Sequence, residues 1–373
     1  MENPKPAVKK ILILCLQGLG NTLLFTPTLR LLRQDIPGAE ITVMVSRESS
    51  RQLLSGNPDL DSIYFFDPRR PSSFFRLFRL LQRIRSVHFD VCLTAFPANR
   101  REFNLLSWLS GAGIRIGHCY PHKSLRSLSF LQNFRVPLNL RAHDVDQNLA
   151  LLSPLGIKVP DAWEKRLDIV LEPEHIHFAQ QWLRAHKLNS DSLIVGFHPG
   201  SSPERGMIHK RWPAKHFAQL ASLLGQEYKA KIIIFGGPEE ESLKAEVAGL
   251  TGQALPGEAI LVAPSSNFKE TAALISSCRL FISNDTGLMH VATAVGVPTL
   301  GIFGPTDEVR TRPWINGRFV ARPDLDCRPC WTLKEVGLRR RCLHRERICL
   351  SRLSPEAVFK AGEKMIGEMK SGL

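Results

Sequence analysis

The residues best suited to chemistry lie in one stretch, SNDTGLMHVATAVGVPTLGIFGPTD, from Ser283 to Asp307. A first polar turn, 284–287, holds Asp285 and Thr286, and His290 follows one helical turn later on the same face. The N–H groups at the start of a helix, together with its dipole, favour an anion there, phosphate above all. The alternative is structural: Asp285 and Thr286 cap a helix through their oxygens, and His290 is a core histidine.

The surrounding pattern predicts how these residues are positioned. The apolar segments 280–282 and 299–303 are typical of buried parallel strands. The segment 288–295 between them has the pattern of a short helix, which Gly296 and Pro298 end. The polar turns 284–287 and 304–307 therefore follow the carboxyl ends of neighbouring strands, the edge at which open α/β sheets bind ligands.

This stretch resembles the signature of the lipopolysaccharide heptosyltransferases, glycosyltransferase family nine. That family carries an aspartate–threonine/serine–glycine turn with a following histidine, and then a glycine–proline–threonine–aspartate turn. The resemblance implies an inverting, metal-independent transfer of a sugar from a nucleotide-diphosphate donor, ADP-heptose in the family, to a lipid A-linked inner-core saccharide. It covers nearly the whole chain and is strongest over 281–307, good over 196–213 and partial over 11–30.

A second strand and turn begin the C-terminal half. The apolar segment 193–197 precedes a turn of small residues, 198–202, which can bring N–H and hydroxyl groups to phosphate oxygens. Lys210 stands just before Trp212 and Pro213, where the family has a lysine, and it could neutralise the charge that grows on a departing diphosphate. On its residue type alone, Lys210 is equally a surface charge.

A carboxylate after the strand 231–235 could hold ribose hydroxyls, as a glutamate does in the family. Three glutamates are adjacent here, 239–241, and Glu240 is our choice among them. By resemblance, the donor-binding candidates are Ser201, Ser202, Lys210, Glu240, Asp285, Thr286, Gly287, Leu288 and His290, with Lys210 and Asp285 also in catalytic roles.

The N-terminal opening departs from the family. An apolar strand, 10–16, leads into a glycine-rich turn, 17–22, and a helix, 23–34. The family has an aspartate in this turn, the proposed base that deprotonates the acceptor hydroxyl, and this chain has Asn21. An amide cannot take a proton at neutral pH, so Asn21 could only orient that hydroxyl. Either another carboxylate serves as base, or leaving-group activation carries more of the barrier, or the protein is catalytically impaired. The acceptor-binding candidates are Gly20, Asn21 and Thr22.

Composition sets the class and the partners. A chain of 373 residues with 43% hydrophobic and 23% charged residues is typical of a globular protein of about two domains. The net charge of +14 favours anionic partners: the nucleotide-sugar donor, the lipid-linked acceptor and the anionic inner-membrane surface. Nucleic acid is not expected, because we find no zinc-finger or RNA-binding aromatic signature. A polar start and short apolar runs predict no signal peptide or span, hence a cytoplasmic protein peripherally associated with the membrane.

A basic amphipathic helix is predicted over 68–86, with Phe74, Phe78 and Leu81 on one face and arginines around the rest. Such a helix could bind anionic lipid at a membrane surface, or pack its apolar stripe against the N-terminal sheet. Further basic residues could grip anionic groups of the acceptor through bidentate contacts. These candidates are Arg100, Arg101, Arg115, Lys123 and Arg126.

Four of the eight cysteines, Cys327, Cys330, Cys342 and Cys349, are separated by two, eleven and six residues. This spacing resembles a four-thiolate set for a structural zinc ion. Stable disulfides are not expected in the cytoplasm. The alternative is a structural feature of the family without metal, because some members carry a similar cysteine-rich tail. No cofactor is expected for catalysis.

The alternation of strands and helices predicts an α/β fold with two Rossmann-like, doubly wound domains. The resemblance implies the GT-B arrangement, in which two such domains face each other across a cleft. We expect an acceptor-binding domain at 1–180, a nucleotide-sugar-binding domain at 181–352, and a C-terminal helix at 353–373 that returns toward the N-terminal domain. Two other functions stay open: a same-fold transferase with another nucleotide sugar for O-antigen or capsule, and a catalytically impaired nucleotide-sugar-binding protein.

Overall fold

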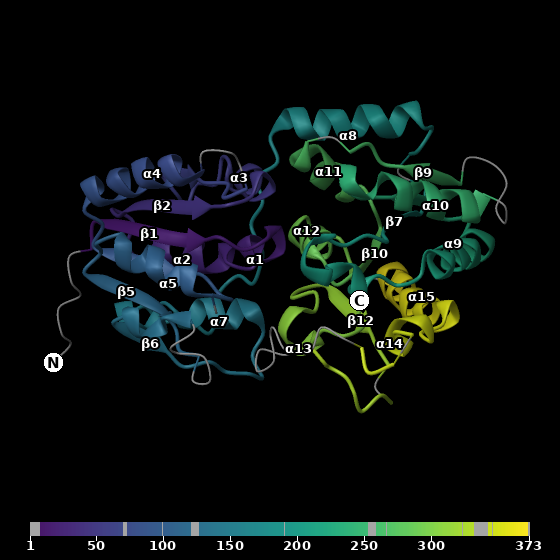
Figure 1. Cartoon of the computed structure of the whole chain (residues 1–373). Helices are drawn as coiled ribbons and strands as arrows, with labels where there is room; N and C mark the ends of the chain where they lie inside the picture. The colour runs from purple at the N-terminus through teal and green to yellow at the C-terminus, as the bar shows by residue number, and fades with distance from the viewer. Residues whose placement is uncertain are drawn as a thin grey trace. The chain divides into compact units, whose positions relative to one another are not determined.

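The computed structural model describes residues 8–69, 73–98, 100–120, 127–189, 191–252, 259–265, 267–322, 324–331, 342–344 and 346–371. The chain forms two compact units, residues 1–170 and 171–373 (Figure 1). Each unit contains one six-stranded sheet, and every strand pair in both sheets is parallel. The predicted α/β class and the two doubly wound halves are therefore confirmed.

The N-terminal sheet has the strand order β3-β2-β1-β4-β5-β6, with β1 at its centre and buried along nearly its whole length. Its strands are β1 (Lys10–Cys15), β2 (Glu40–Val45), β3 (Ser62–Phe65), β4 (Val91–Thr94), β5 (Ile114–His118) and β6 (Phe134–Val136). The helices of this unit are α1 (Leu19–Leu23), α2 (Thr26–Asp35), α3 (Glu48–Leu54), α4 (Ser73–Val87), α5 (Arg101–Leu109) and α7 (Asp144–Ala150), with short 3₁₀ turns η2 (Ser129–Leu131) and η3 (Ser153–Leu155).

The segment that we expected to form one helix, 23–34, belongs to two helices. The second, α2, begins at Thr26 and has Pro27 in its first turn, where a missing N–H group loses no hydrogen bond. The first, α1, occupies most of the expected glycine-rich turn. Asn21 therefore lies in a helical turn that follows the carboxyl end of β1, rather than in a loop.

The C-terminal sheet has the strand order β12-β11-β10-β7-β8-β9. Its strands are β7 (Ile194–His198), β8 (Lys231–Ile234), β9 (Ile260–Val262), β10 (Leu280–Asn284), β11 (Thr299–Ile302) and β12 (Gly317–Val320). The helices are α8 (Pro173–Ala185), α9 (Ala214–Tyr228), α10 (Glu241–Gly252), α11 (Phe268–Ile275), α12 (Gly287–Ala294), α13 (Glu308–Thr311), α14 (Ile348–Ser351) and α15 (Pro355–Ser371), with 3₁₀ segments η4 (Glu204–Lys210) and η5 (Pro238–Glu240). The strand order reverses between β7 and β10, which makes their carboxyl ends the switch point of the sheet.

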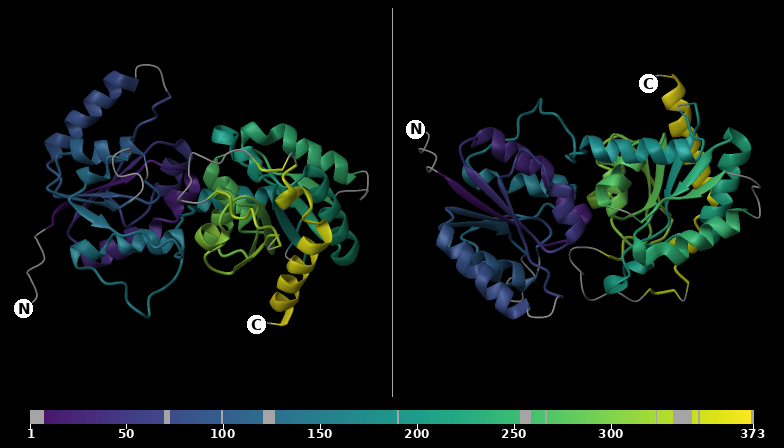
Figure 2. Two further views of the ribbon diagram at one scale, coloured as in Figure 1. Left: turned by 60° about the horizontal axis from the view of Figure 1, so that its bottom comes forward. Right: turned by 90° about the horizontal axis from the view of Figure 1, so that it is seen from above.

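The last helix, α15, belongs to the C-terminal unit, and its expected return toward the N-terminal domain stays a prediction. It packs against α9 and against β10, β11 and β12. Figure 2 shows α15 as the yellow ribbon of this unit. The physical reason is its apolar stripe, since Val358, Met365 and Ile366 are buried in the core of this unit. The boundary at residues 170 and 171 also precedes the expected position, because α8 packs against α11.

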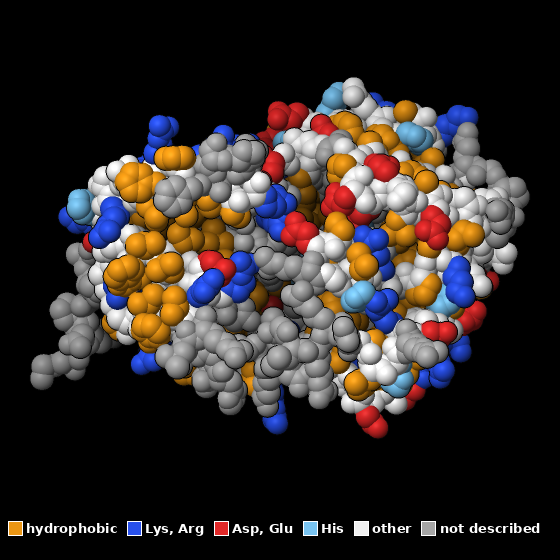
Figure 3. Space-filling view, viewed as in Figure 1, with side chains coloured by type: hydrophobic (Ala, Val, Ile, Leu, Met, Phe, Trp, Pro, Cys, Tyr) orange, Lys and Arg blue, Asp and Glu red, His pale blue; other side chains and the backbone are white. Residues whose placement is uncertain are grey.

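The amphipathic helix α4 shows features of both alternatives. Ile84 is buried against the N-terminal sheet, in a cluster that α5 joins through Leu106. Phe75 and Phe78 are left 70% and 55% exposed, while the side chain of Phe74 lies outside the described residues. Figure 3 shows hydrophobic side chains gathered on the N-terminal unit, with Lys and Arg side chains beside them. In the described part of the chain, no helix is both long and apolar enough to cross a bilayer.

Candidate functional site

The first polar turn ends a central strand of the C-terminal sheet. β10 closes at Asn284 and leads directly into Asp285 and Thr286, and its parallel neighbour β7 closes at His198. Because parallel neighbours end at the same edge, the turns after the two strands meet at the switch point. The predicted placement of these residues at the carboxyl edge of the sheet is therefore observed.

Lys210, the last residue of η4, forms an ion pair with Asp285. The Lys210 Nζ atom lies 3.1 Å from Asp285 Oδ2, and the two side chains are only 14% and 7% exposed. Burial alone would raise the pKa of Asp285, but Lys210, together with His290 and Thr306, holds that pKa below its ordinary value. Asp285 is thus ionised at neutral pH, and Lys210 stands beside it where the helix α12 begins.

The start of α12 has no side-chain cap among the described residues. Thr286 is the N-cap residue, yet its hydroxyl is bonded to His198 Nδ1 at 2.8 Å instead of to a helix N–H group. Asp285 is held by Lys210. The structural alternative, in which these two residues only cap the helix, therefore does not describe this site. Gly287 and Leu288 open the helix, and their N–H groups can bind an anion.

His198, which the sequence did not single out, connects the ends of three strands. Besides Thr286, it contacts Glu240, with 3.1 Å between Nε2 and Oε2. Burial would raise the pKa of Glu240, but His198, the Gly237 N–H group and Arg211 lower it to about 2. The carboxylate also occupies the space of any side chain at Gly200, because a Cβ there would lie 1.9 Å from Glu240 Oε1.

The two serines of the 198–202 turn have different surroundings. Ser201 is buried, and its hydroxyl donates to the Met207 carbonyl at 2.9 Å and accepts from Arg211 Nε at 3.1 Å. Ser202 is exposed, and its hydroxyl accepts from the Glu204 N–H group at 3.2 Å. Ser201 therefore shapes the loop that carries Lys210, whereas Ser202 presents its side chain at the surface.

Asn284 is a second residue that the sequence did not reveal as important. Its side-chain oxygen accepts from the Trp212 N–H group at 3.0 Å, and its amide donates to the carbonyls of Pro199 and Gly200 at 2.7 and 3.2 Å. It fixes the end of β10 to the loop after β7. The sequence alone could not indicate this role, because the hydrogen-bond partners of Asn284 lie more than 70 positions away.

His290 is buried, and burial lowers its pKa to about 4, so the imidazole is neutral at pH 7. Its Nδ1 atom has no hydrogen-bond partner within the described residues. A neutral, buried imidazole with an unused nitrogen can donate or accept one further hydrogen bond. A ligand contact of His290 stays a prediction.

The second polar turn follows β11. Arg328 donates from Nε to the Gly304 carbonyl at 2.6 Å and pairs with Glu308 at 2.8 Å. Asp307 accepts from the Val309 N–H group at 3.0 Å and so caps α13. Arg328, in the segment that follows Cys327, therefore holds this turn in place.

The acceptor-binding candidates lie in α1 of the N-terminal unit. Asn21 is half-buried, and the buried Thr22 hydroxyl lies 3.0 Å from Ser50 Oγ, which links α1 to α3. Among the basic candidates, Arg115 is held by the carbonyls of Leu131 and Ala112. Arg100 is exposed and pairs with Glu102, Arg101 is exposed, and Lys123 and Arg126 lie outside the described residues.

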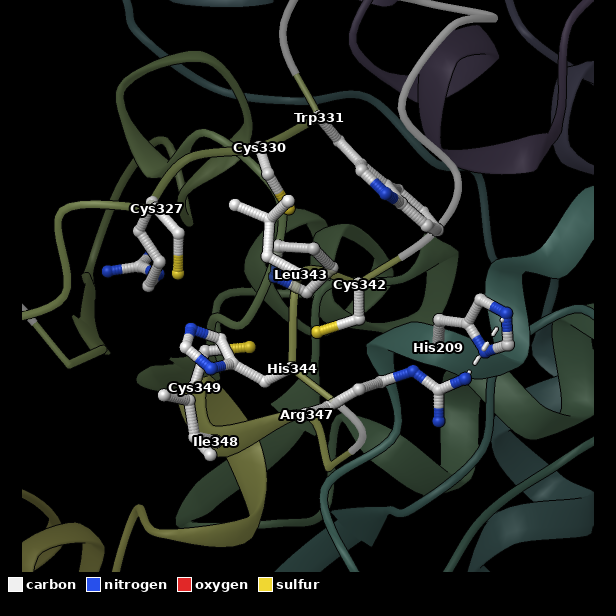
Figure 4. A pocket seen from close by; sticks show the side chains of 12 residues that line it. His209, Cys327, Cys330, Trp331, Cys342, Leu343, His344, Arg347, Ile348 and Cys349 are labelled. Atoms are coloured by element: carbon white, nitrogen blue, oxygen red, sulfur yellow. Dashed lines mark hydrogen bonds between the residues drawn. The ribbon is translucent and has the colours of Figure 1, made fainter.

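The four cysteines of the expected zinc set line one cavity, together with His209 and His344 (Figure 4). Within the described ranges, no three His, Cys, Asp or Glu side chains stand at the spacing of metal ligands. The zinc prediction thus finds no formed ligand set to support it. Cys342 is exposed, Cys327 and Cys330 are half-buried, and Cys349 is buried.

The model of glycosyltransferase family 9 (heptosyltransferase) matches residues 77–336. The chain belongs to this family. This glycosyltransferase is 26% identical over 303 residues to lipopolysaccharide heptosyltransferase 3 of Escherichia coli, an alignment that covers 80% of this chain and 84% of the relative. The sequence resemblance and the prediction of glycosyl transfer are confirmed.

Solved structures share the fold of this glycosyltransferase. The family 9 glycosyl transferase from Veillonella parvula DSM 2008 superposes with a TM-score of 0.76 at 26% identity, covering 96% of this chain and 97% of that chain. The E. coli heptosyltransferase WaaC with ADP-2-deoxy-2-fluoro heptose has a TM-score of 0.68 at 20% identity, covering 95% and 99%. The predicted fold, the α/β architecture of GT-B heptosyltransferases, is therefore confirmed.

Proposed function

We propose that this glycosyltransferase moves heptose from ADP-heptose to an inner-core acceptor of lipopolysaccharide, with inversion at the anomeric carbon and without a catalytic metal ion. Support comes from the relative named lipopolysaccharide heptosyltransferase 3 and from the WaaC structure with an ADP-heptose analogue. The observation that carries the proposal is the buried Lys210–Asp285 pair at the uncapped start of α12.

In this proposal the donor diphosphate binds at the start of α12. The bond between the anomeric carbon and the phosphate oxygen breaks, and its electron pair stays on that oxygen. Lys210 and the N–H groups of Gly287 and Leu288 stabilise the negative charge that develops. Asp285 acts through Lys210, because the ion pair holds the ammonium group in place. Fixed positive groups thus do the work that a metal ion does in other transferases.

The remaining donor contacts follow from the sheet edge. Glu240, which contacts His198, is the candidate to bind the ribose hydroxyls. His290 is the candidate for a further hydrogen bond to the donor, through its unpartnered Nδ1 atom. Ser202 is available for a phosphate oxygen at the surface, while Ser201 contributes through the shape of its loop.

The acceptor is assigned to the N-terminal unit, at Gly20, Asn21 and Thr22. The acceptor hydroxyl attacks the anomeric carbon from the face opposite the leaving diphosphate, which inverts the configuration, and the hydroxyl proton passes to solvent water. Asn21 orients this hydroxyl but does not deprotonate it. Stabilisation of the leaving group by Lys210 therefore contributes more to lowering the activation barrier than in a relative with an aspartate at this position.

We also propose that the protein associates peripherally with the inner face of the cytoplasmic membrane, where a lipid-linked acceptor is found. Phe75 and Phe78 of α4 and Trp108 of α5 are at least half exposed. The exposed arginines Arg76, Arg79 and Arg83 surround the phenylalanines on α4. Aromatic side chains that can enter the headgroup region, next to cationic side chains, fit an anionic bilayer.

The test is the variant Lys210→Ala, compared with Lys215→Ala, which removes an exposed lysine at the start of α9. We expect Lys210→Ala to lower kcat by about 10²–10³ and to weaken ADP binding in calorimetry, because a preorganised charge at the leaving group is lost. The Lys215→Ala variant should behave as the wild type. Unchanged turnover in Lys210→Ala would contradict the proposal.

One observation favours a second candidate function, a nucleotide-sugar-binding protein without turnover: Asn21 stands where the family has its proposed base. Such a protein would bind ADP-heptose, lose affinity in Lys210→Ala and form no product in either form. A third outcome, tight binding and turnover with a UDP- or GDP-sugar instead, would identify a same-fold transferase with another donor.

A further inference from the structure

Four cysteines from three separate segments meet at one cavity of the C-terminal unit. The cavity has a volume of about 40 Å³, more than the roughly 10–15 Å³ that one water molecule needs. Figure 4 shows Cys327, Cys330, Cys342 and Cys349 on different sides of it. These thiols differ from Cys15 and Cys278, which are buried in the hydrophobic cores of the two sheets.

Two histidines, His209 and His344, line the same cavity as the four thiols. Several thiolates at one place would repel one another, so they require a cation among them. Two guanidinium groups, of Arg328 and Arg347, also line the cavity.

We propose that Cys327, Cys330, Cys342 and Cys349 bind one divalent transition-metal ion, Zn²⁺ or Fe²⁺, as a structural four-thiolate site. Four sulfur ligands in tetrahedral arrangement select these metals. Four thiolates around a divalent ion leave a net negative charge, which Arg347 offsets. Arg328 lies beside it but is paired with Glu308. Since no three donors of the described residues are yet at ligand spacing, the thiols have to turn about their Cα–Cβ bonds toward the cavity.

The position of the cavity gives this ion a role in the donor site. The N–H groups of Cys330 and Trp331 both donate to the Pro305 carbonyl, at 3.0 and 2.9 Å, within the turn after β11. From another side, Leu350, next to Cys349, packs so closely on Gly304 that a Cβ there would lie 2.6 Å from Leu350 Cγ. A metal ion would hold these two contacts to the turn together.

The same cavity reaches the loop of Lys210. His209, the residue before Lys210, lines the cavity, and its Nε2 atom lies 3.2 Å from Arg347 Nη2. An ion that fixes Cys342 and Cys349 also fixes the segment that carries Arg347. The metal site would therefore position the turn at Gly304 and the loop at Lys210 without contacting the substrate.

The first test measures metal in the full chain, purified without a chelator and with its affinity tag removed. We expect about one atom of zinc or iron per chain by mass spectrometry. Cys330→Ser and Cys349→Ala should lose it, whereas Cys119→Ser, a half-buried cysteine of the N-terminal unit, should keep it. Iron would show itself by visible thiolate absorption. A metal content below about one tenth per chain, with no uptake of added Zn²⁺ or Fe²⁺, would overturn the proposal.

A second measurement covers the case in which the cysteine variants do not fold. Wild-type protein is treated with a chelator and titrated with Co²⁺, which gives charge-transfer absorption when thiolates bind it. A titration that saturates at about one Co²⁺ per chain supports the site, and the absence of the absorption overturns it.

The positioning role rests on the proposed function and is tested separately. Removal of the metal should weaken ADP binding about fivefold or more, through the turn at Gly304 and the loop at Lys210, and added Zn²⁺ should restore it. If metal is present but ADP affinity does not change on its removal, the positioning role fails while the metal site stands. If neither form binds a nucleotide sugar, the proposed function fails.

Discussion

Lys210 and Asp285 are 75 positions apart in the sequence, yet their charged atoms are 3.1 Å apart and mostly buried. A buried ion pair contributes little net stability, but the loss of one partner leaves the other charge unpaired. We therefore expect Lys210→Ala to lower the free energy of unfolding by about 3 kcal/mol in urea titrations. A Lys210→Ala variant as stable as the wild type would contradict a buried ion pair between Lys210 and Asp285.

The double variant Lys210→Ala with Asp285→Asn serves as the control. It removes both charges, so most of the stability lost in the single variant should return. Turnover should not return, because the positive charge at the leaving group is still missing. Recovery of turnover together with stability would mean that Lys210 acts only on the fold.

A pH prediction follows from His118 in β5. Its Nε2 atom lies 2.9 Å from the Gln147 carbonyl, and burial lowers its pKa to about 4. Between pH 6.5, the ordinary pKa, and about 4, the unfolded chain binds a proton that the folded chain does not. The free energy of unfolding should therefore fall as the pH is lowered through this window, and His118 should contribute nothing further below it.

The variant His118→Gln isolates this effect, since an amide can still donate to the Gln147 carbonyl. Its unfolding free energy should fall less steeply than that of the wild type, by about 1.4 kcal/mol per pH unit between pH 6 and 4.5. The exposed His177, replaced by Gln, is the control and should leave the slope unchanged. If the unfolding free energies of His118→Gln and the wild type depend equally on pH, the pKa of His118 is not lowered in the folded protein.

At the scale of single elements, α4 carries the membrane prediction. Replacing Phe75 and Phe78 by Ser should not disturb the fold, because both are exposed, but should weaken sedimentation with anionic phospholipid vesicles at least tenfold, roughly the loss of two partly buried aromatic rings. Phe130→Ser, at another exposed position of the N-terminal unit, is the control. Unchanged vesicle binding of the α4 variant would rule out this helix as the contact.

The sequence predicted the central elements well, because their patterns are local. β1, β7, β10 and β11 are short apolar runs followed by turn residues, and all four are strands. The short edge strand β6 was not predicted: two of its three residues are exposed, so no buried run marks it. The break between α1 and α2 was also missed, because the apolar periodicity continues through it.

The candidate site was predicted in part for the same reason. Asp285, Thr286 and His290 follow one another within a single motif, and the structure confirms their common place at the sheet edge. His198 and Glu240 could not be paired from the sequence, since they are 42 positions apart and meet only when β7 and β8 lie side by side.

At the scale of the whole molecule, donor and acceptor functions are assigned to different units. The donor candidates all lie at the carboxyl edge of the C-terminal sheet, and the acceptor candidates follow β1 of the N-terminal sheet. Each unit has its own core. Variants at Asn21 should consequently change turnover without changing the affinity for the donor nucleotide.

The most direct measurement is a donor screen by calorimetry with ADP-heptose, UDP-sugars and GDP-sugars, followed by turnover on inner-core acceptors, for the wild type and Asn21→Asp. We expect ADP-heptose to bind most tightly to both proteins, and the wild type to form the inverted product with asparagine at position 21. Product from Asn21→Asp alone would show a donor site that is kept and a base that is lost. No binding of any nucleotide sugar would contradict the proposed function.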